Sequence, residues 1–511
     1  MYMARAPHLP GTGIVTITPS GSFDPAKTPG LFRLVFPSVM LPMFMAVSDS
    51  TIVASAVPAM AASLGDVERV SWVVVAYLVA ATIAAPVYGY LGDVFGRRRL
   101  MFLALTLFMG ASVLCALAPS VLWLAAARVL QGFGGGGLMS LSQALIGEVV
   151  PPRQRGHYQS YLATVATVSS VFGPVAGGFL TEHLGWKSIF LINLPLGVVA
   201  FLLVFRIQHR PGVRHEQWSF DTPGLLYFVS FIAPILIAME QLRHFDPSTA
   251  PQVIALFAVA GLALFLLLRR ERVAPAPLLP MALLAQPVIW RANGLAACHG
   301  ASLTALVAFL PIYLRVAHGL SASQMGLMLL PISIGIGVGS IITGRLVTRT
   351  GQTMIFPSWG LMGATLGLLV FALFGAAVTM TQLLVVLTIS SLFMGTVMAV
   401  VQVTVQTAAG RKALGTGAGS IQFSRTVGAA FGTALLGSIL FATLAFTDPE
   451  APVIFARLVD SGAAALADLS PARRMAITDD IALAFRLAFL LIPLFTGVGV
   501  LLAWTNPSRR I

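Results

Sequence analysis

A single carboxylate, Asp49, lies near the middle of the apolar segment 34–64. An ionised carboxylate inside a lipid bilayer costs about 2.5 to 3.5 kcal/mol on insertion scales, and such residues usually bind or relay protons, ions or substrates. Asp49 is therefore the first candidate functional residue, and the chemistry it predicts is proton binding and release. The alternative is that Asp49 only forms a hydrogen bond to a neighbouring helix.

Arg128 is the one basic residue deep in the first half of the apolar sequence, so it is the expected partner of Asp49. Burial favours the neutral form of a carboxyl group, whereas a nearby cation favours the ionised form. We therefore expect a proton and a substrate to compete near these two residues, so that loading one releases the other. The alternative is that the Arg128 side chain extends to the membrane interface.

Further polar and aromatic side chains fall inside apolar segments and form a candidate substrate cavity. They are Trp72, Tyr77, Gln143, Asn193, His299, Tyr313, Gln402, Gln406 and Arg425. Intramembrane polar groups usually face the interior of a helix bundle, although hydrogen bonding between helices is the alternative for each of them. His299 is also the alternative proton carrier, because an imidazole titrates close to neutral pH.

The elements that must position these residues are transmembrane helices. The chain has 511 residues, of which 57% are hydrophobic and 10% charged, with a mean hydropathy of +0.89. This composition excludes a water-soluble globular protein. Apolar runs of about 20 residues predict helices, because barrel strands are shorter and alternate in polarity. Fourteen such runs are present.

The basic residues predict the topology. The net charge of +13 does not indicate nucleic-acid binding, because most of the 31 Lys and Arg residues lie in alternate short loops and not in one patch. That pattern predicts an even number of spans with both termini in the cytoplasm. The expected regions are a tail (1–33), a six-helix bundle (34–210), a two-helix insert with its connector (211–287), a second six-helix bundle (288–505) and a C-terminal tail (506–511).

Several other chemistries are not indicated. Cys115 and Cys298 lie in separate apolar runs and have no metal-ligand spacing. The run Gly132–Gly137 fits G-x-G-x-x-G, but it has no preceding strand, and no phosphate-binding G-x-x-x-x-G-K-[ST] motif occurs. We therefore expect no cofactor and no metal, and an ion gradient as the source of energy.

The segment 447–480 is the one long connection between the later spans. It contains Asp448, Glu450, Asp460, Asp468, Asp479 and Asp480, together with Ile454, Phe455, Leu458 and Val459 at helical spacing. The pattern predicts a short surface helix. A docking site for a periplasmic adaptor protein is the alternative.

Two loops half a chain length apart share the pattern G-x-L-x-x-x-x-G, namely 89–96 and 344–351. They predict two related six-helix halves, which is a transporter architecture. The segment 89–99, with Gly89, Asp93, Gly96, Arg97 and Arg98, resembles the signature loop of the major facilitator superfamily. The resemblance implies a loop that gates access, in which Asp93 and the arginines form ion pairs. Thr348 replaces the aspartate in the second copy.

Other segments resemble the fourteen-helix drug:proton antiporters of that superfamily. They are Ser48–Val53 followed by Pro58, Arg128–Gly132, and Gly173, Pro174, Gly177 and Gly178, with Ser169 in place of an upstream glycine. The resemblance implies an all-α integral membrane protein with two six-helix bundles plus a two-helix insert. It also implies that Gly173 to Gly178 pack the fifth span closely, as in antiporters.

The sequence thus predicts an exporter of small amphipathic or lipophilic compounds, driven by proton exchange across a bacterial cytoplasmic membrane. The expected partners are the substrate, protons and the lipid bilayer, without nucleic acid, and the expected state is a monomer. A dedicated exporter of one metabolite, lipid or siderophore is the alternative. A membrane-embedded enzyme and a channel are alternatives from other classes, but no cluster of acids or nucleophile with its base supports an enzyme.

Overall fold

The computed structural model describes residues 29–65, 69–207, 221–242, 249–274, 277–320, 322–375, 378–461 and 469–510. These residues are almost entirely helical, as predicted. Within these ranges, β structure is limited to an isolated bridge between Gln352 and Arg510.

The first bundle and the insert follow the predicted order. The helices of the first bundle are α1 (Pro29–Leu64), α2 (Trp72–Phe95), α3 (Arg97–Ala116), α4 (Val121–Val149), α5 (Arg155–Leu184) and the pair α6 (Ser188–Leu191) and α7 (Asn193–Phe205). The insert consists of α8 (Thr222–Leu242) and α9 (Ala250–Glu271). A short 3-10 helix, η2 (Pro152–Gln154), precedes α5.

The second bundle repeats this arrangement after the short helix α10 (Met281–Leu284). Its helices are α11 (Pro287–His318), α12 (Ala322–Thr350), α13 (Ile355–Phe374), the pair α14 (Met380–Met394) and α15 (Val397–Ala409), α16 (Leu414–Thr447), and the pair α18 (Pro471–Phe489) and α19 (Leu491–Thr505). The 3-10 helix η4 (Arg411–Ala413) precedes α16, and α17 (Ala451–Ser461) follows it.

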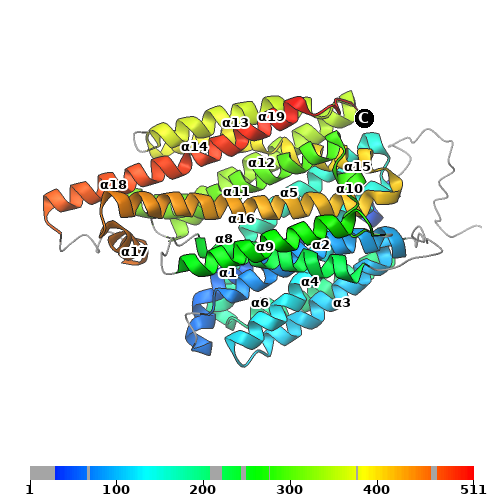
Figure 1. Ribbon diagram of the computed structural model, residues 1–511, viewed down its shortest axis with the longest axis horizontal. Helices are drawn as coiled ribbons and strands as arrows, with labels where there is room; N and C mark the ends of the chain where they lie inside the picture. Colours follow the sequence, from blue (N-terminus) through cyan, green and yellow to red (C-terminus); the bar gives the residue numbers. More distant parts are fainter. Residues whose placement is uncertain are drawn as a thin grey trace, which may run out of the picture.

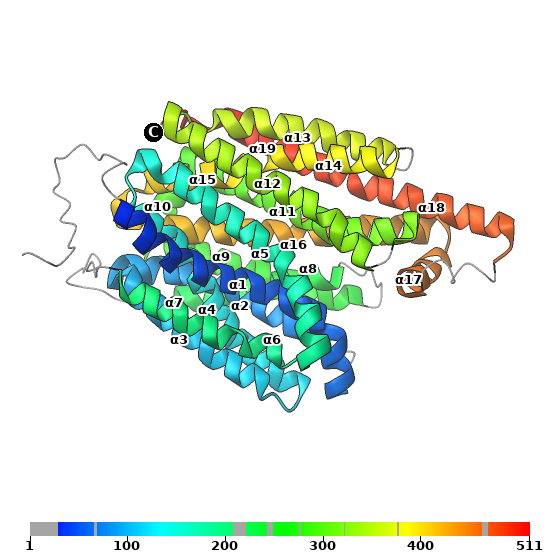
Figure 2. The same cartoon turned by 180° about the vertical axis from the view of Figure 1, so that it is seen from behind.

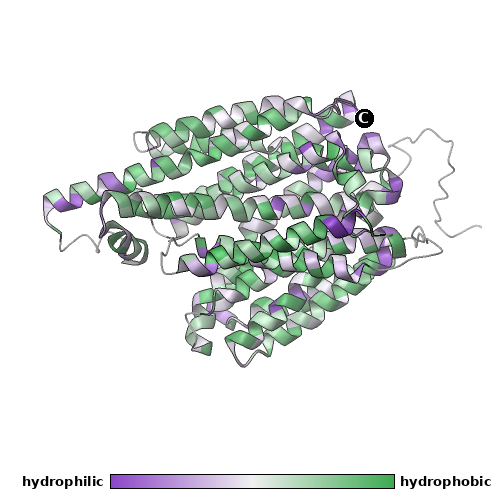
Figure 3. Ribbon diagram, in the orientation of Figure 1, coloured by the Kyte–Doolittle hydropathy of each residue, from purple (hydrophilic) through white to green (hydrophobic). Residues whose placement is uncertain are grey.

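Thirteen helical segments of the described chain are long and apolar enough to cross a membrane. Helix α4 completes the predicted fourteen: its 29 residues are long enough to span a bilayer, although it carries Arg128, Gln131 and four consecutive glycines. Figure 3 shows apolar residues along most of the length of the helices and many of the hydrophilic residues toward the helix ends. The chain is a multi-pass membrane protein.

The two bundles meet at one end of the molecule. We call this end, where α1 begins and α19 ends, the terminal face, and the other end the opposite face. The ribbons of the two bundles lie close together at the terminal face and diverge toward the opposite face (Figures 1 and 2). The structure therefore has the two bundles closed against each other at the terminal face.

Two pairs of glycines make this closure, and they show the predicted repeat. A Cβ at Gly89 on α2 would lie 2.3 Å from the carbonyl oxygen of Gly415 on α16. A Cβ at Gly344 on α12 would lie 2.5 Å from the carbonyl oxygen of Gly156 on α5. Only glycine permits backbones to approach this closely. The loops that share the sequence pattern thus make equivalent contacts with the other bundle.

The insert packs against both bundles. Phe228, Ile232 and Leu236 of α8 are buried in one cluster with Ile83 of α2. The ring of Phe228 also lies 5.5 Å from that of Phe423 on α16. Apolar burial of this kind fixes α8 beside the junction of α2 and α16, where both bundles meet.

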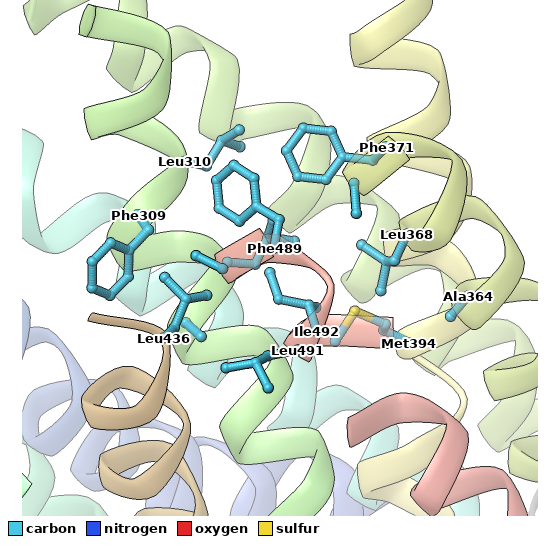
Figure 4. Close-up of a cluster of buried hydrophobic side chains, with 14 of the residues drawn as sticks. Phe309, Leu310, Ala364, Leu368, Phe371, Met394, Leu436, Phe489, Leu491 and Ile492 are labelled. Atoms are coloured by element: carbon cyan, nitrogen blue, oxygen red, sulfur yellow. The ribbon is translucent and has the colours of Figure 1, made fainter. Parts of the chain in front are cut away.

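The second bundle has a large apolar core, and it includes a predicted cavity residue. Figure 4 shows Phe371 and Phe489 in this core, surrounded by leucine, isoleucine and methionine side chains. Tyr313 is buried there, with its ring 6.1 Å from Phe371 and 5.6 Å from Phe489. Tyr313, which we predicted to line the cavity, therefore packs its ring among the aromatic side chains of this core.

The predicted boundary between the N-terminal tail and the first helix is corrected by the structure. Helix α1 begins at Pro29, within the region predicted as a tail, because proline is well tolerated in the first turn of a helix. Residues 1–28 lie outside the described residues. At the other end, Asn506 donates a hydrogen bond from Nδ2 to the Val288 carbonyl oxygen at 3.0 Å, and Thr353 N donates to the Arg509 carbonyl oxygen at 3.0 Å. The C-terminal segment is therefore attached to the second bundle.

The surface helix predicted in the segment 447–480 is confirmed as α17. Its apolar residues Ile454, Phe455 and Leu458 are buried against the bundle. Arg473 at the start of α18 bonds to Asp448 at 2.5 Å and to Glu450 at 3.0 Å, which ties α18 to the end of α16. Residues 462–468, including Asp468, lie outside the described residues.

Candidate functional site

Asp49 and Arg128 form a buried ion pair. The two side chains have an exposed fraction of 0%, and Arg128 Nη1 donates to Asp49 Oδ2 at 2.5 Å. Arg128 Nε also donates to the Val73 carbonyl oxygen on α2 at 3.1 Å. The alternative in which Arg128 extends to the membrane interface is therefore wrong, because the helices of the first bundle enclose its guanidinium.

Two amides complete the shell around the Asp49 carboxylate. Gln131 Nε2 and Asn193 Nδ2 donate to Asp49 Oδ1 at 2.9 and 2.7 Å. Both amides also donate to Ser112 Oγ, at 2.9 and 3.3 Å. All three partners of Asp49 are donors, so each of them stabilises the ionised carboxylate. We call Asp49, Arg128, Gln131, Asn193, Ser112 and Tyr77 the carboxylate cluster.

The ring of Tyr77 packs against the guanidinium group of Arg128. Its ring centroid lies 4.1 Å from Cζ of Arg128, a cation–π distance. Its hydroxyl donates to the Ala46 carbonyl oxygen on α1 at 2.8 Å. Tyr77 and Asn193, which we predicted to line the substrate cavity, therefore belong to the carboxylate cluster.

Glycines on α4 make room for this cluster. A Cβ at Gly132 would lie 2.5 Å from the Tyr77 carbonyl oxygen, and one at Gly136 would lie 2.3 Å from the Ala81 carbonyl oxygen. The run Gly132–Gly137 thus allows α2 to lie against α4, with Tyr77 next to Arg128. These glycines of the run are therefore explained by helix packing.

The loop between α2 and α3 locks the terminal face. Asp93 pairs with Arg97, and its carboxylate accepts hydrogen bonds from Gly415 N at 2.9 Å, Thr416 N at 2.8 Å and Thr416 Oγ1 at 3.0 Å. Gly415 and Thr416 lie in the first turn of α16. The Asp93 carboxylate therefore lies at the N-terminal end of that helix, where a negative charge is stabilised. This charged lock joins the first bundle to the second.

The arginines of the loop bind within their own bundle. Arg97 Nη1 lies 2.6 Å from Glu148 Oε2 on α4. Arg98 Nη2 donates to the Phe205 carbonyl oxygen on α7 at 2.6 Å. Gly96, with φ of 92°, adopts the left-handed turn between α2 and α3 that favours glycine. The predicted ion pair of Asp93 is present, whereas its bonds to α16 were not foreseen.

A cluster of neutral amides joins the bundles deeper in the molecule. Gln402 on α15 donates to the side-chain oxygen of Gln143 on α4, and Gln406 Nε2 donates to the Gln143 carbonyl oxygen at 3.0 Å. The oxygen atoms Oε1 of Gln402 and Gln406 are buried without a partner. These residues were predicted to line a cavity, and in this structure they form contacts between the bundles.

The motif on α5 packs against α1, as the resemblance implied. A Cβ at Gly173 would lie 1.8 Å from Thr51 Oγ1, and one at Gly177 would lie 2.3 Å from Ser55 Oγ. At Gly178, by contrast, an added Cβ meets nothing within 4 Å. Gly173 and Gly177 are therefore packed closely against α1, whereas Gly178 has open space beside it. Pro174 is exposed.

The remaining cavity candidates separate into two groups. Trp72, at the start of α2, is 41% exposed and lies at the opposite face, away from the centre of the bundles. His299 on α11 and Arg425 on α16 lie together in the second bundle, where Gly300 approaches the Arg425 carbonyl oxygen. Nδ1 of His299 and Nε of Arg425 are buried without a hydrogen-bond partner.

Sequence reasoning missed three functional contacts. Gln131 stood in the Arg128–Gly132 motif, and its spacing of three residues from Arg128 placed both on one helix face. Ser112 carried no signal that distinguished it from other intramembrane serines. Gly415 and Thr416 carried only their position after a basic turn, so their pairing with Asp93 required the tertiary structure.

Comparisons with known proteins place this architecture in a family. A sequence model of the Major Facilitator Superfamily matches residues 39–433. The chain belongs to the major facilitator superfamily. This is a superfamily of transporters and not of enzymes, as the sequence predicted.

Individual relatives agree with this membership. The chain is 32% identical to an uncharacterized MFS-type transporter of Mycobacterium tuberculosis over 85% of its own length, but spans only 62% of the length of that relative. It is 29% identical to the multidrug transporter protein MdtP of Bacillus subtilis, covering 80% of this chain and 75% of MdtP. It is 27% identical to the acurin A biosynthesis cluster MFS-type transporter of Aspergillus aculeatus, covering 95% and 91%.

Solved structures show the same fold. The proton:xylose symporter XylE gives a TM-score of 0.60 at 14% identity, covering 93% of this chain and 96% of XylE. The human organic anion transporter MFSD10 gives a TM-score of 0.59 at 16% identity, covering 90% and 99%. At these identities the likeness concerns the fold alone.

Proposed function

We propose that this protein is a proton-coupled antiporter that exports small amphipathic or lipophilic compounds across a bacterial cytoplasmic membrane, with both termini in the cytoplasm. The observation that supports it most is the carboxylate cluster. Asp49 is fully buried, and all its hydrogen-bond partners donate to it. A proton that arrives at Asp49 removes the charge that holds Arg128, Gln131 and Asn193 in place.

The contacts of Asp93 and Arg97 can couple protonation of Asp49 to the junction between the two bundles. The carboxylate cluster joins α1, α2, α3, α4 and α7, and α4 also carries Glu148, which binds Arg97 next to Asp93. Protonation of Asp49 releases Arg128 on α4, and α4 and α2 then repack at both sites. In the proposal, this repacking opens the terminal face to the cytoplasm, where the substrate enters.

A proton supplies enough free energy for useful export. One charge that crosses 100 mV contributes about 2.3 kcal/mol, and tenfold accumulation costs about 1.4 kcal/mol. One proton therefore supports roughly fifty-fold export of a neutral compound. For a monocation exchanged one for one, the voltage terms cancel and only the pH gradient drives transport.

Relatives support export but differ in cargo. MdtP is named as a multidrug transporter, which supports a broad substrate range. The Aspergillus aculeatus relative is named for a biosynthesis cluster, which favours the alternative of a dedicated metabolite exporter. The partners we propose are the substrate, protons and the bilayer, for a monomer that needs no cofactor. An adaptor protein at the segment 447–480 is the alternative partner.

The test is transport in proteoliposomes with an imposed pH gradient and a panel of lipophilic cations, neutral compounds and anions. We expect Asp49→Asn to abolish gradient-driven accumulation and to retain substrate counterflow, which requires no proton movement. The matched control is Glu182→Gln, which removes an exposed carboxylate of α5. Accumulation by Asp49→Asn at the wild-type level would show that Asp49 is not the proton carrier. Accumulation of a single metabolite alone would favour the dedicated exporter.

A further inference from the structure

Arg425 is an intramembrane cation of the second bundle. It lies on α16, eleven residues after the helix begins at Leu414, which places it about 16 Å into the helix. It is half-buried, and its Nε is buried without a hydrogen-bond partner. In the described part of the chain, no carboxylate forms an ion pair with it. A guanidinium in such a place carries a desolvation cost that no protein charge offsets.

The sequence explains why no counterion is available. No Asp or Glu occurs between Glu271 and Asp448, so the helices α11 to α16 contain no carboxylate. In the first bundle, Asp49 is already bound by Arg128 and two amides. Asp93 is bound by Arg97 and by the start of α16. A ligand with a negative charge would supply the counterion that these helices lack.

Glycines bring His299 beside this arginine. A Cβ at Gly300 would lie 2.2 Å from the Arg425 carbonyl oxygen, and one at Gly428 would lie 2.1 Å from the Ala297 carbonyl oxygen. Helices α11 and α16 therefore touch through their backbones at this depth. His299, next to Gly300, is 3% exposed, and its Nδ1 has no hydrogen-bond partner.

Arg425 lies near the junction of the bundles. Gln422, one helical turn earlier on α16, donates from Nε2 to Met139 Sδ on α4 at 3.4 Å. Residues three apart share a face of a helix, so Arg425 lies between α11 and the part of α16 that contacts the first bundle.

We propose that Arg425 and His299 form an anion-binding subsite, which takes the carboxylate, sulfonate or phosphate group of an amphipathic substrate. Arg425 supplies a permanent charge and a fork of N–H donors that matches such oxygens, and His299 supplies a ring N–H. This proposal rests on the proposed export function and names the substrate class. The preferred substrates are then lipophilic monoanions, whose tails lie against the apolar helix surfaces.

The experiment measures binding of two matched probes to the full chain in phosphatidylcholine nanodiscs by calorimetry. The probes are N-dansyl-leucine, which carries a carboxylate, and N-dansyl-leucinamide, which is neutral and of the same shape. We expect the wild-type protein to bind the carboxylate about 10- to 100-fold more tightly than the amide, as for a hydrogen bond to a charged group.

Four variants locate this preference. Arg425→Gln is expected to reduce the ratio of the two affinities to about 1 while amide binding persists, which also shows that the variant is folded. Arg425→Lys is expected to retain part of the preference, because it keeps the charge without the fork. His299→Ala reduces the ratio less than Arg425→Gln does. The control Arg291→Gln, at the terminal-face end of α11, leaves the ratio unchanged.

Equal wild-type affinity for both probes, no binding of the carboxylate, or an unchanged ratio in Arg425→Gln would each overturn the subsite. Loss of gradient-driven transport for every compound, with the ratio intact, would overturn the export function and leave the subsite standing. Replacement of phosphatidylcholine by phosphatidylglycerol distinguishes the source of the anion. Weaker probe binding in wild type but not in Arg425→Gln supports the subsite, with a lipid head group as the anion.

Discussion

The two bundles have the same fold, but the surroundings of their intramembrane arginines differ. In the first bundle, Arg128 is enclosed with Asp49, two amides and an aromatic ring, so its charge is balanced within the protein. In the second, Arg425 lies on α16 beside α11, and neither helix contains a carboxylate. The proposal assigns proton exchange to the first site, where three donors of the protein bind the Asp49 carboxylate. At the second site, the proposal assigns the counterion to a bound anionic substrate.

The loops at the terminal face differ in the same sense. The loop of the first bundle holds the second through the carboxylate of Asp93, whereas its counterpart carries Thr348, whose hydroxyl donates to the Gly344 carbonyl oxygen of its own helix at 2.9 Å. Both loops approach the other bundle through a glycine, Gly89 or Gly344. The two loops therefore share the close glycine contact with the other bundle. The charged contact of Asp93 is made by the first loop, and its counterpart has Thr348 at that position.

The largest difference is expected between neutralisation of the two arginines. Arg128→Gln leaves the buried Asp49 without its cation, and loss of one partner of a buried pair costs about 3 to 5 kcal/mol. Arg425→Gln removes no ion pair and is expected to change the free energy of unfolding by less than about 1 kcal/mol. Reversible unfolding in mixed micelles measures both. Equal losses of stability would contradict the comparison.

A double variant separates the structural role of the pair from its functional role. Asp49→Asn combined with Arg128→Gln removes both charges, so the two variants are expected to be coupled by about 1 to 3 kcal/mol, with the double variant more stable than the sum predicts. Proton-coupled transport stays absent, because no carboxylate remains. Additive losses would mean that the pair contributes no interaction energy.

The two loops are compared by Asp93→Asn and Thr348→Val. Asp93→Asn weakens the bonds to α16, each worth about 1.5 to 3 kcal/mol for a charged group, so the terminal face opens. Distances between spin labels at positions 153 and 412, in η2 and η4, are expected to lengthen in Asp93→Asn. Thr348→Val should leave them as in the wild type. An unchanged distance distribution in Asp93→Asn would show that the glycine contacts alone hold the face closed.

The smallest effect concerns the glycines of α5. Gly178→Ala adds a Cβ in open space and is expected to stabilise the helix by about 0.5 to 1 kcal/mol. Gly177→Ala places the same atom against Ser55 and Ile52 of α1 and is expected to destabilise the protein. Thermal unfolding of both variants tests this. A loss of stability in Gly178→Ala would point to a neighbour that the present conformation lacks.

The sequence by itself determined the class of the protein, because hydropathy, charge and loop motifs are local. It predicted the helical membrane fold, the two-helix insert, the pair of related halves and the functional candidates Asp49 and Arg128. It also predicted the helix α17 and the close packing of Gly173 and Gly177. Each of these depends on residues near one another in the chain or on a pattern within one helix.

The tertiary structure decided which polar groups meet. Tyr77 and Asn193 joined Asp49 instead of a cavity, Tyr313 entered an aromatic core, and Gln143 reached Gln402 in the other bundle. All of these are polar or aromatic residues within apolar helices, and sequence gives them the same expectation. Their partners lie on helices distant in the chain, so only the packing angles and the glycine contacts that set them could determine these pairings.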